Sequence, residues 1–156
     1  MTDITLRRLE PTDVDHCAAM LESLPEWFGL PEANAGYVAA LGELPGTVAV
    51  DGGGDVVGFV AVRSHTPSSD EIEVMAVVRD RHGGGIGRRL VDAAIAHSRA
   101  RGARWLHVKT RGPSTYDDDY ERTRRFYTAV GFEPLYESLT EWGPDDAALV
   151  LVMRLD

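Results

Sequence analysis

The chain has 156 residues, 44% of them hydrophobic, so we expect one domain over residues 1–156 with a sizeable buried core. The formal net charge of −9 argues against a nucleic-acid-binding protein, because such proteins usually carry a basic face. Cys17 is the only cysteine, which excludes an internal disulfide, and no apolar run approaches the ~20 residues of a membrane span. These properties predict a cytoplasmic protein that binds neither nucleic acid nor a membrane.

The first half of the chain reads as short strands and helices. Residues 4–8 alternate apolar and charged side chains, as a half-buried strand does. Pro25 ends the first helix, and D-G-G-G-D at residues 51–55 is typical of a hairpin turn between two strands. Residues 66–70 are polar and predict a loop. This half predicts strands over 4–8, 47–50 and 56–63 and helices over 12–24 and 33–41.

The second half predicts a central strand, a long helix and a closing set of strands. Residues 72–78 are apolar and β-branched, which favours a strand, and Gly102 ends the helix that follows. The polar sequence at 111–120 is long for a loop in a compact domain and is therefore a candidate for function. The remaining patterns predict a helix over 122–130 and strands over 105–110, 132–139 and 147–155. The order β-α-α-β-β-β-α-β-α-β-β indicates an α/β fold with a mixed sheet covered by helices.

Between the central strand and the long helix the chain is rich in glycine. The backbone is bare and able to adopt positive φ at Gly83, Gly84, Gly85 and Gly87. A bare loop that opens onto a helix presents free N–H groups and the positive end of the helix dipole. Such an arrangement binds phosphate, although a run of glycines can also be only a flexible surface turn.

Other phosphate-binding and oxyanion motifs do not fit this stretch. The dinucleotide fingerprint G-x-G-x-x-G fails because Arg88 and Leu90 stand where it needs glycine. The nucleotide loop G-x-x-x-x-G-K-[ST] fails because no lysine follows these glycines. An H-G-G-G string serves as an oxyanion hole in esterases that also carry G-x-S-x-G, which this chain lacks.

What fits is G-x-G-I-G-x-x-L at residues 83–90, after a strand that ends in A-V. This resembles motif A of the GNAT superfamily, the acyl-CoA-dependent N-acyltransferases. F-Y-T-A-V-G-F at residues 126–132 looks like motif B of the same family, in the correct order and one strand further along the chain. The resemblance spans essentially the whole length and implies the GNAT fold, a mixed, mostly antiparallel central sheet flanked by helices.

The resemblance implies acetyl-CoA as cosubstrate. It places backbone donors for the phosphates in the glycine loop and main-chain partners for pantetheine on the central strand. His82 stands where the family usually has Arg or Gln, which puts one side-chain contact in doubt. No group of ligands has metal-site spacing, so we expect no metal. The cofactor-binding candidates are Met75, Ala76, Val77, His82, Gly83, Gly84, Gly85, Ile86, Gly87 and Arg88.

Transfer to an amine requires a proton acceptor, directly or through water, because amines are protonated at neutral pH. Glu71 and Glu73 share one face of the central strand, since side chains alternate along a strand. Glu73 matches the position at which many family members carry an acid on this strand, and Glu71 is its neighbour. His107 on the following strand is a third candidate, because its ordinary pKa of roughly 6.5 suits a base near neutrality. Edge exposure of the carboxylates is the alternative.

Tyr127 lies in the motif B match, where family members commonly use this tyrosine to protonate the coenzyme A thiolate. A phenol with a pKa near 10 is a suitable donor to a developing thiolate, although Tyr127 could also be simply a core residue. Many relatives carry Asn seven residues earlier, where this chain has Tyr120. Any cofactor contact made by that Asn is therefore not transferred.

The predicted function is direct attack of a primary amine on the acetyl-CoA thioester. The acceptor is a small-molecule or peptide amine whose identity stays open. Trp27, Phe28 and Tyr116 are the candidates for its pocket, although Trp27 and Phe28 could also simply fill the core. The alternative is a non-catalytic acyl-CoA-binding or regulatory module. A homodimer is compatible with the resemblance, because dimers are common in that family.

Overall fold

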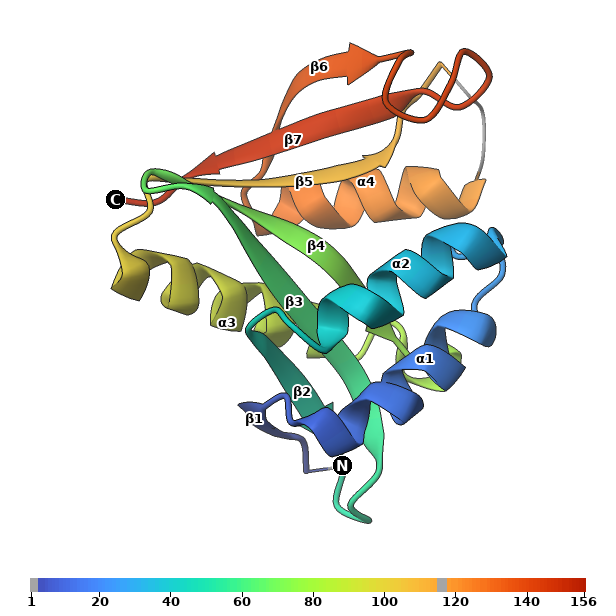
Figure 1. The fold of residues 1–156 in the computed structure, drawn as a ribbon, viewed down its shortest axis with the longest axis vertical. Coiled ribbons are helices and arrows are strands. Elements are labelled where there is room, and N and C mark those ends of the chain that lie inside the picture. The colour runs from blue at the N-terminus through green and yellow to red at the C-terminus, as the bar shows by residue number, and fades with distance from the viewer. Residues whose placement is uncertain (1–2, 115–117) are drawn as a thin grey trace. The chain divides into compact units, whose positions relative to one another are not determined.

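A computed structural model describes residues 3–114 and 118–156 (Figure 1). The described chain forms two compact units. The first consists of Met1–Arg63 and Ile72–His97, and the second of Ser64–Glu71 and Ser98–Asp156. None of the helices within the described ranges is long and apolar enough to cross a membrane.

The helices and strands occur along the chain in the predicted order. The strands are β1 Thr5–Arg8, β2 Gly46–Val50, β3 Val56–Thr66, β4 Ser69–Val77, β5 Trp105–Arg111, β6 Glu133–Ser138 and β7 Ala148–Arg154. The helices are α1 Val14–Glu22, α2 Pro31–Leu41, α3 Ile86–Arg101 and α4 Asp118–Val130, with short 3-10 turns η1 Pro11–Asp13 and η2 Arg79–Arg81.

Over the described residues the strands form a seven-stranded sheet in the order β1-β2-β3-β4-β5-β7-β6. The pairs β1–β2, β2–β3, β5–β7 and β6–β7 are antiparallel. The crossing of β7 into the position beside β5 leaves β6 at the edge. The predicted mixed, mostly antiparallel sheet flanked by helices is confirmed.

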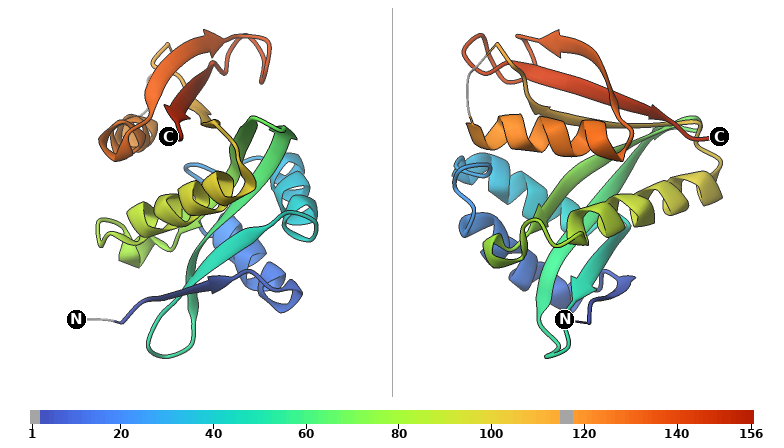
Figure 2. Two further views of the ribbon diagram at one scale, coloured as in Figure 1. Left: turned by 90° about the vertical axis from the view of Figure 1, so that its left-hand side faces the viewer. Right: turned by 180° about the vertical axis from the view of Figure 1, so that it is seen from behind.

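In the first unit, helices cover both faces of the strands. Figure 2 shows α1 and α2 on one face of β2–β4 and α3 on the other. Gly58 on β3 allows α3 to approach closely, because a Cβ there would lie 3.1 Å from Leu90 Cδ1 and 3.2 Å from Ile86 Cγ2. Cys17 is fully buried, as its apolar neighbours predicted. The core on the α1–α2 side includes Leu9, Met20, Leu21, Leu24, Leu41, Val48, Phe59, Ala61, Val74 and Ala76.

In the second unit, α4 lies alongside β5 (Figure 1). Leu106, Phe132 and Leu151 are almost completely buried there. Gly131 ends α4 with φ of +116°, which confirms the predicted left-handed residue at the end of this helix. The edge strand β6 is largely exposed.

Two boundary predictions were wrong. Residues 66–70 were expected to form a loop, but β3 continues to Thr66 and β4 begins at Ser69. Asp70 is fully buried in β4 because Arg101 Nε donates to its Oδ1 over 2.9 Å, so a polar residue belongs to the interior here. The fourth helix begins at Asp118 rather than 122, and its first turn carries acidic residues that the helix dipole favours.

Candidate functional site

The glycine loop connects β4 to α3 and has two residues in the left-handed region. Gly83 has φ of +81° and Gly85 has φ of +86°, whereas Gly84 and Gly87 do not adopt positive φ. A side chain is disfavoured at both left-handed positions, which explains glycine there. Arg89 N–H donates to Gly85 O, the first i→i−4 hydrogen bond of α3. The N–H groups before Arg89 therefore lie at the positive end of the helix, as an anion site requires.

His82 secures the start of this loop. Its Nε2–H donates to Val77 O over 2.7 Å, and its ring meets Trp27 edge-on with centroids 5.6 Å apart. The imidazole therefore ties the loop to the last residue of β4 and to the aromatic segment after α1. The side chain that replaces the usual Arg or Gln is engaged within the protein.

Arginines surround the loop, and most of them are already paired. Arg79 forms a bidentate pair with Glu26, and Arg81 Nη2 lies 3.0 Å from Asp51 Oδ2. Arg89 Nη1 donates to Ile4 O over 2.8 Å. Arg88 is exposed and makes no hydrogen bond or ion pair within the described part of the chain. Among these arginines, Arg88 is the one available to an anionic ligand.

The segment predicted to bind pantetheine forms the last three residues of β4. Ala76 is buried, and Met75 and Val77 are half-buried, so alternate side chains point away from the α1–α2 core. Val77 O accepts from His82, and Val78 N–H donates to Val57 O over 2.9 Å. The segment and the glycine loop are thus held together within the first unit.

The two strand carboxylates have different surroundings. Glu73 Oε2 accepts a hydrogen bond from Arg63 Nε over 3.1 Å, and its carboxylate is therefore engaged by a cation. Glu71 is buried and meets imidazoles instead. Its Oε1 lies 2.7 Å from His65 Nε2 and 3.5 Å from His107 Nε2. The structure therefore brings Glu71 and His107 together, whereas Glu73 has an arginine partner.

The charge state of Glu71 follows from these neighbours. Burial alone would raise its pKa, but the imidazoles of His107 and His65 and the ammonium of Lys109 outweigh burial and hold the pKa below its ordinary value. Lys109 Nζ is 3.8 Å from Glu71 Oε2 and 2.5 Å from Glu141 Oε1. Glu71 is thus an ionised carboxylate that orients two imidazoles.

Tyr127 lies on α4 in a buried aromatic group. Its ring packs edge-on against Phe126 and Phe132, with centroids 5.2 Å and 5.5 Å away. Burial, with a smaller contribution from Tyr120, raises the pKa of Tyr127 above its ordinary value. The phenol therefore stays protonated at neutral pH. Its hydroxyl makes no hydrogen bond within residues 3–114 and 118–156, so its proton is available to a ligand.

The predicted acceptor residues are only partly described. Trp27 and Phe28 are half-buried and pack against the core, and Phe28 meets Tyr37 edge-on at 6.0 Å. Trp27 also contacts His82, which links this segment to the glycine loop. Tyr116 lies outside the described residues. Tyr120, at the position where relatives have Asn, lies on α4 with the Arg111 guanidinium 5.7 Å from its ring centre.

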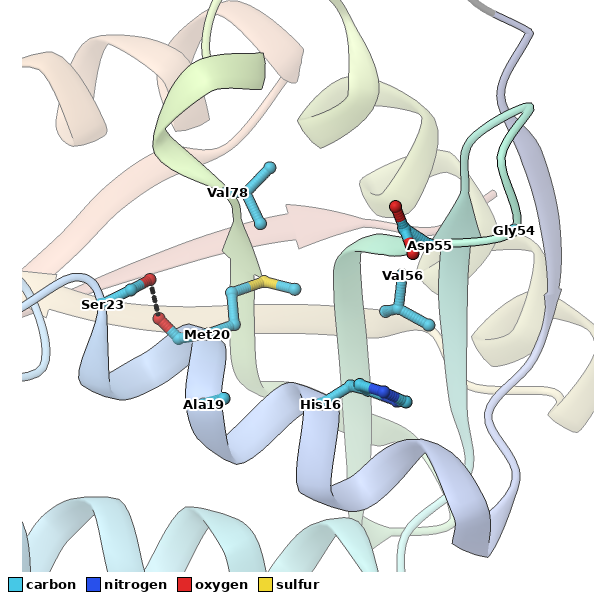
Figure 3. Close-up of a pocket in the computed structure, with 8 residues that line it drawn as sticks. All are labelled: His16, Ala19, Met20, Ser23, Gly54, Asp55, Val56 and Val78. Atoms are coloured by element: carbon cyan, nitrogen blue, oxygen red, sulfur yellow. Dashed lines mark hydrogen bonds between the residues drawn. The ribbon is translucent and has the colours of Figure 1, made fainter.

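A separate hollow of about 370 Å³ lies between α1, the β2–β3 turn and the end of β4. Figure 3 shows the residues that line it. Met20, Val56 and Val78 make part of its wall apolar. The predicted site residues that the structure describes do not line it. Its lining residues are His16, Ala19, Met20, Ser23, Gly54, Asp55, Val56 and Val78.

Sequence reasoning missed His65. It lies on β3, two residues before the turn that leads into β4, and contacts Glu71 through the side chain. The available signal was the hairpin itself, because antiparallel neighbours across a tight turn bring residues six positions apart into contact. Treating residues 66–70 as a loop removed that signal.

Comparison with known proteins gives matches along much of the chain. A profile of the Acetyltransferase (GNAT) domain matches residues 43–134. A mycothiol acetyltransferase from Actinosynnema mirum is 33% identical over 85 residues, which are 54% of this chain. Those residues span only 27% of that relative's length.

Solved structures with similar folds cover nearly the whole chain. A GNAT-family protein from Desulfovibrio desulfuricans has a TM-score of 0.85 and 21% identity, over 99% of this chain and 100% of that chain. An aminoglycoside 6'-N-acetyltransferase complexed with coenzyme A has a TM-score of 0.75 and 20% identity, covering 99% and 97%. The ribosomal-protein-S18-alanine N-acetyltransferase from Escherichia coli has a TM-score of 0.77 and 18% identity. The match covers 99% of this chain and 95% of that chain. At these identities the likeness establishes the fold.

Proposed function

The chain belongs to the GNAT acetyltransferase family, and on that basis we propose that it transfers an acetyl group from acetyl-CoA to a primary amine. The observation that carries the proposal is the loop with Gly83 and Gly85 in the left-handed region, directly before α3. This geometry presents several N–H groups to one anion. The coenzyme A bound by a structural neighbour carries phosphates that such a loop would accept.

The residues present fit this cosubstrate. A Cβ built on Gly83 or Gly85 meets nothing within 4 Å, so the space beside the loop is open to a ligand. Arg88 supplies a cation that has no partner within the described ranges. We assign the phosphates to the loop from His82 to Arg88 and the pantetheine to the main chain of Met75, Ala76 and Val77. Bound acetyl-CoA supplies the thioester.

In the proposed reaction, the amine nitrogen attacks the thioester carbonyl, a C–N bond forms and the C–S bond breaks. The amine gives up a proton to an acceptor on the protein, and the departing thiolate receives a proton from Tyr127. The Tyr127 hydroxyl makes no hydrogen bond with the described residues, and its pKa is raised. Both support this role, because the phenol is protonated when the thiolate forms. The products are the amide and free coenzyme A.

We place the proton acceptor at the Glu71–His107 pair rather than at Glu73, the first choice from sequence. Glu73 Oε2 is already paired with Arg63 Nε over 3.1 Å, and no imidazole contacts it in the described part of the chain. Glu71 is ionised and lies beside two imidazoles, so it can stabilise an imidazolium that forms next to it. Neutral histidine is a suitable acceptor near pH 7.

The acceptor is a small-molecule amine or a peptide amine. The relatives named above differ widely in acceptor, from an aminoglycoside to a ribosomal protein's alanine. Trp27 and Phe28 are proposed for its pocket because they adjoin the loop through His82 and are only half-buried. A homodimer and a cytoplasmic location are proposed on the family resemblance and the composition alone.

The test is release of free thiol from acetyl-CoA in the presence of an amine panel. The panel contains an aminoglycoside, a polyamine, free amino acids and an alanine-initiated peptide. Amine-dependent thiol release and a product heavier by one acetyl group would support the proposal. Saturable acetyl-CoA binding without transfer to any amine would favour a non-catalytic acyl-CoA-binding module. The hydrogen bond from His82 to Val77 O is compatible with that alternative too.

A further inference from the structure

Two imidazoles and one carboxylate converge in the second unit. His65 on β3, Glu71 on β4 and His107 on β5 each place one donor atom within 4.8 Å of the other two. Both histidines approach through Nε2, and both approach the same oxygen, Glu71 Oε1. Atoms that meet at one point from three strands form an arrangement that a metal ion can use as well as a proton.

We propose that His65, Glu71 and His107 bind a divalent transition-metal ion, with Zn²⁺ as the probe. Two imidazole nitrogens and one carboxylate oxygen are a ligand set that zinc accepts, and a three-residue site leaves one position for water or another ligand. The sequence predicted no metal because the three residues share no metal-binding motif and His107 lies on a different strand, far along the chain from the other two. Strand pairing, not spacing, brings them together.

The separations are close to what the ion requires. Zinc bonds of 2.0–2.1 Å in a tetrahedral arrangement place neighbouring ligand atoms roughly 3.3 Å apart. The His65–Glu71 and His107–Glu71 pairs stand at 2.7 Å and 3.5 Å, on either side of that value. The His65 and His107 rings have centroids 5.4 Å apart and are tilted by 33°. All three donor atoms lie within 4.8 Å of one another, and binding an ion would bring them to roughly 3.3 Å.

Burial also suits a bound ion. The Glu71 side chain is 9% exposed, His107 is 21% exposed and His65 is 41% exposed. The carboxylate is thus fixed inside the sheet, while the outermost ligand borders solvent and gives the ion a route in.

The charge nearest the site is Lys109, whose ammonium opposes a cation 3.8 Å from Glu71 Oε2. Glu141 Oε1 lies 2.5 Å from the same ammonium and offsets its charge. With neutral imidazoles, Glu71, Glu141 and Lys109 together leave one negative charge. The local charge therefore favours a divalent ion over an anion.

Binding has a consequence for transfer that rests on the proposed function. The ion would take the lone pairs that otherwise accept the amine's proton, so Zn²⁺ would inhibit acetyl transfer. The binding itself does not depend on that function, and it is measured without acetyl-CoA or amine. Failure of the metal site and failure of the acetyltransferase proposal therefore give different results.

The test is calorimetric titration of ZnCl₂ into the full chain after chelator treatment and dialysis. We expect saturable binding of about one equivalent. His65→Ala and His107→Ala should each weaken Zn²⁺ binding at least tenfold, whereas the control His16→Ala, at an exposed position on α1, should bind as the wild type does. Co²⁺ in place of Zn²⁺ should give visible absorption bands that His107→Ala loses.

Thermal unfolding of each variant shows that it is folded before its binding is interpreted. Where His107→Ala is unfolded, His107→Gln and Glu71→Gln replace it. Absence of saturable Zn²⁺ binding by the folded wild type would overturn the proposal. Equal weakening by the His16 control, or unchanged binding in the His65 and His107 variants, would overturn it as well.

Discussion

The glycine loop and the carboxylate–imidazole cluster of His65, Glu71 and His107 differ in how much of their geometry one segment supplies. The loop's conformation is set by Gly83 and Gly85 and by the helix that starts directly after them. The cluster needs side chains from three strands, and no sequence motif joins its members. A contiguous site can therefore be recognised from sequence, whereas a site assembled across strands is recognised only once the pairing is known.

The largest effect should come from the cluster. Glu71→Gln removes the negative charge that orients and stabilises both imidazoles, and we expect kcat for the accepted amine to fall about a hundredfold, the lower range for loss of general base catalysis. The Kd for acetyl-CoA should not change. The matched variant Glu73→Gln should lower kcat less than about tenfold. A larger loss of kcat in Glu73→Gln than in Glu71→Gln would contradict this assignment and favour Glu73 as the proton acceptor, as the sequence suggested.

Tyr127→Phe should lower kcat at least tenfold, because the thiolate loses its proton donor while the aromatic packing is kept. Acetyl-CoA affinity and the midpoint of thermal unfolding should stay near those of the wild type. Tyr120→Phe is the control, since it removes the hydroxyl of another tyrosine on the same helix, α4. Unchanged turnover in Tyr127→Phe would assign Tyr127 to the core alone.

The loop should respond to a single methyl group at one glycine and not at its neighbour. Gly85→Ala forces alanine into the left-handed region at a cost of about 1–2 kcal/mol. We expect a fall in Tm of at least about 2–4 °C and weaker acetyl-CoA binding. Gly84→Ala is the control, because Gly84 has no positive φ and its Cβ would sit 3.4 Å from Arg81 O. Equal effects of the two substitutions would contradict the assigned loop conformation.

The smallest effect concerns the ion pair that anchors the turn before the loop. Arg79 holds the pKa of Glu26 at about 2, chiefly through their hydrogen bonds. Because the folded pKa is below the unfolded one, the pair stabilises the protein above pH of about 4.3 and loses that contribution as the pH falls toward 2. Glu26→Gln should therefore lower Tm at pH 7 by no more than about 2 °C, with the difference closing below pH 4. A difference independent of pH would exclude this account.

Much of the fold could be predicted from the letters, and so could the glycine loop that forms part of the candidate site. Periodicity predicted the order of elements, and the glycine string with the motif at 126–132 predicted the family. The alternation of Glu71 and Glu73 placed both on one strand, but it could not reveal that Arg63 engages one carboxylate and His65 the other. Those partners depend on how β3 continues to Thr66, where polar residues concealed a strand. Partner choice is a tertiary property that local patterns do not carry.

The central claim is that the loop from His82 to Arg88 holds acetyl-CoA. Thermal unfolding with acetyl-CoA, and with ATP and NAD as controls, tests it most directly. At about a hundred times Kd, binding to the folded state should add ~2.7 kcal/mol, which raises Tm by about 5–10 °C for a chain of this size. A shift with acetyl-CoA that Gly85→Ala diminishes is the predicted result. No shift at millimolar acetyl-CoA, or an equal shift with ATP and NAD, would contradict the account.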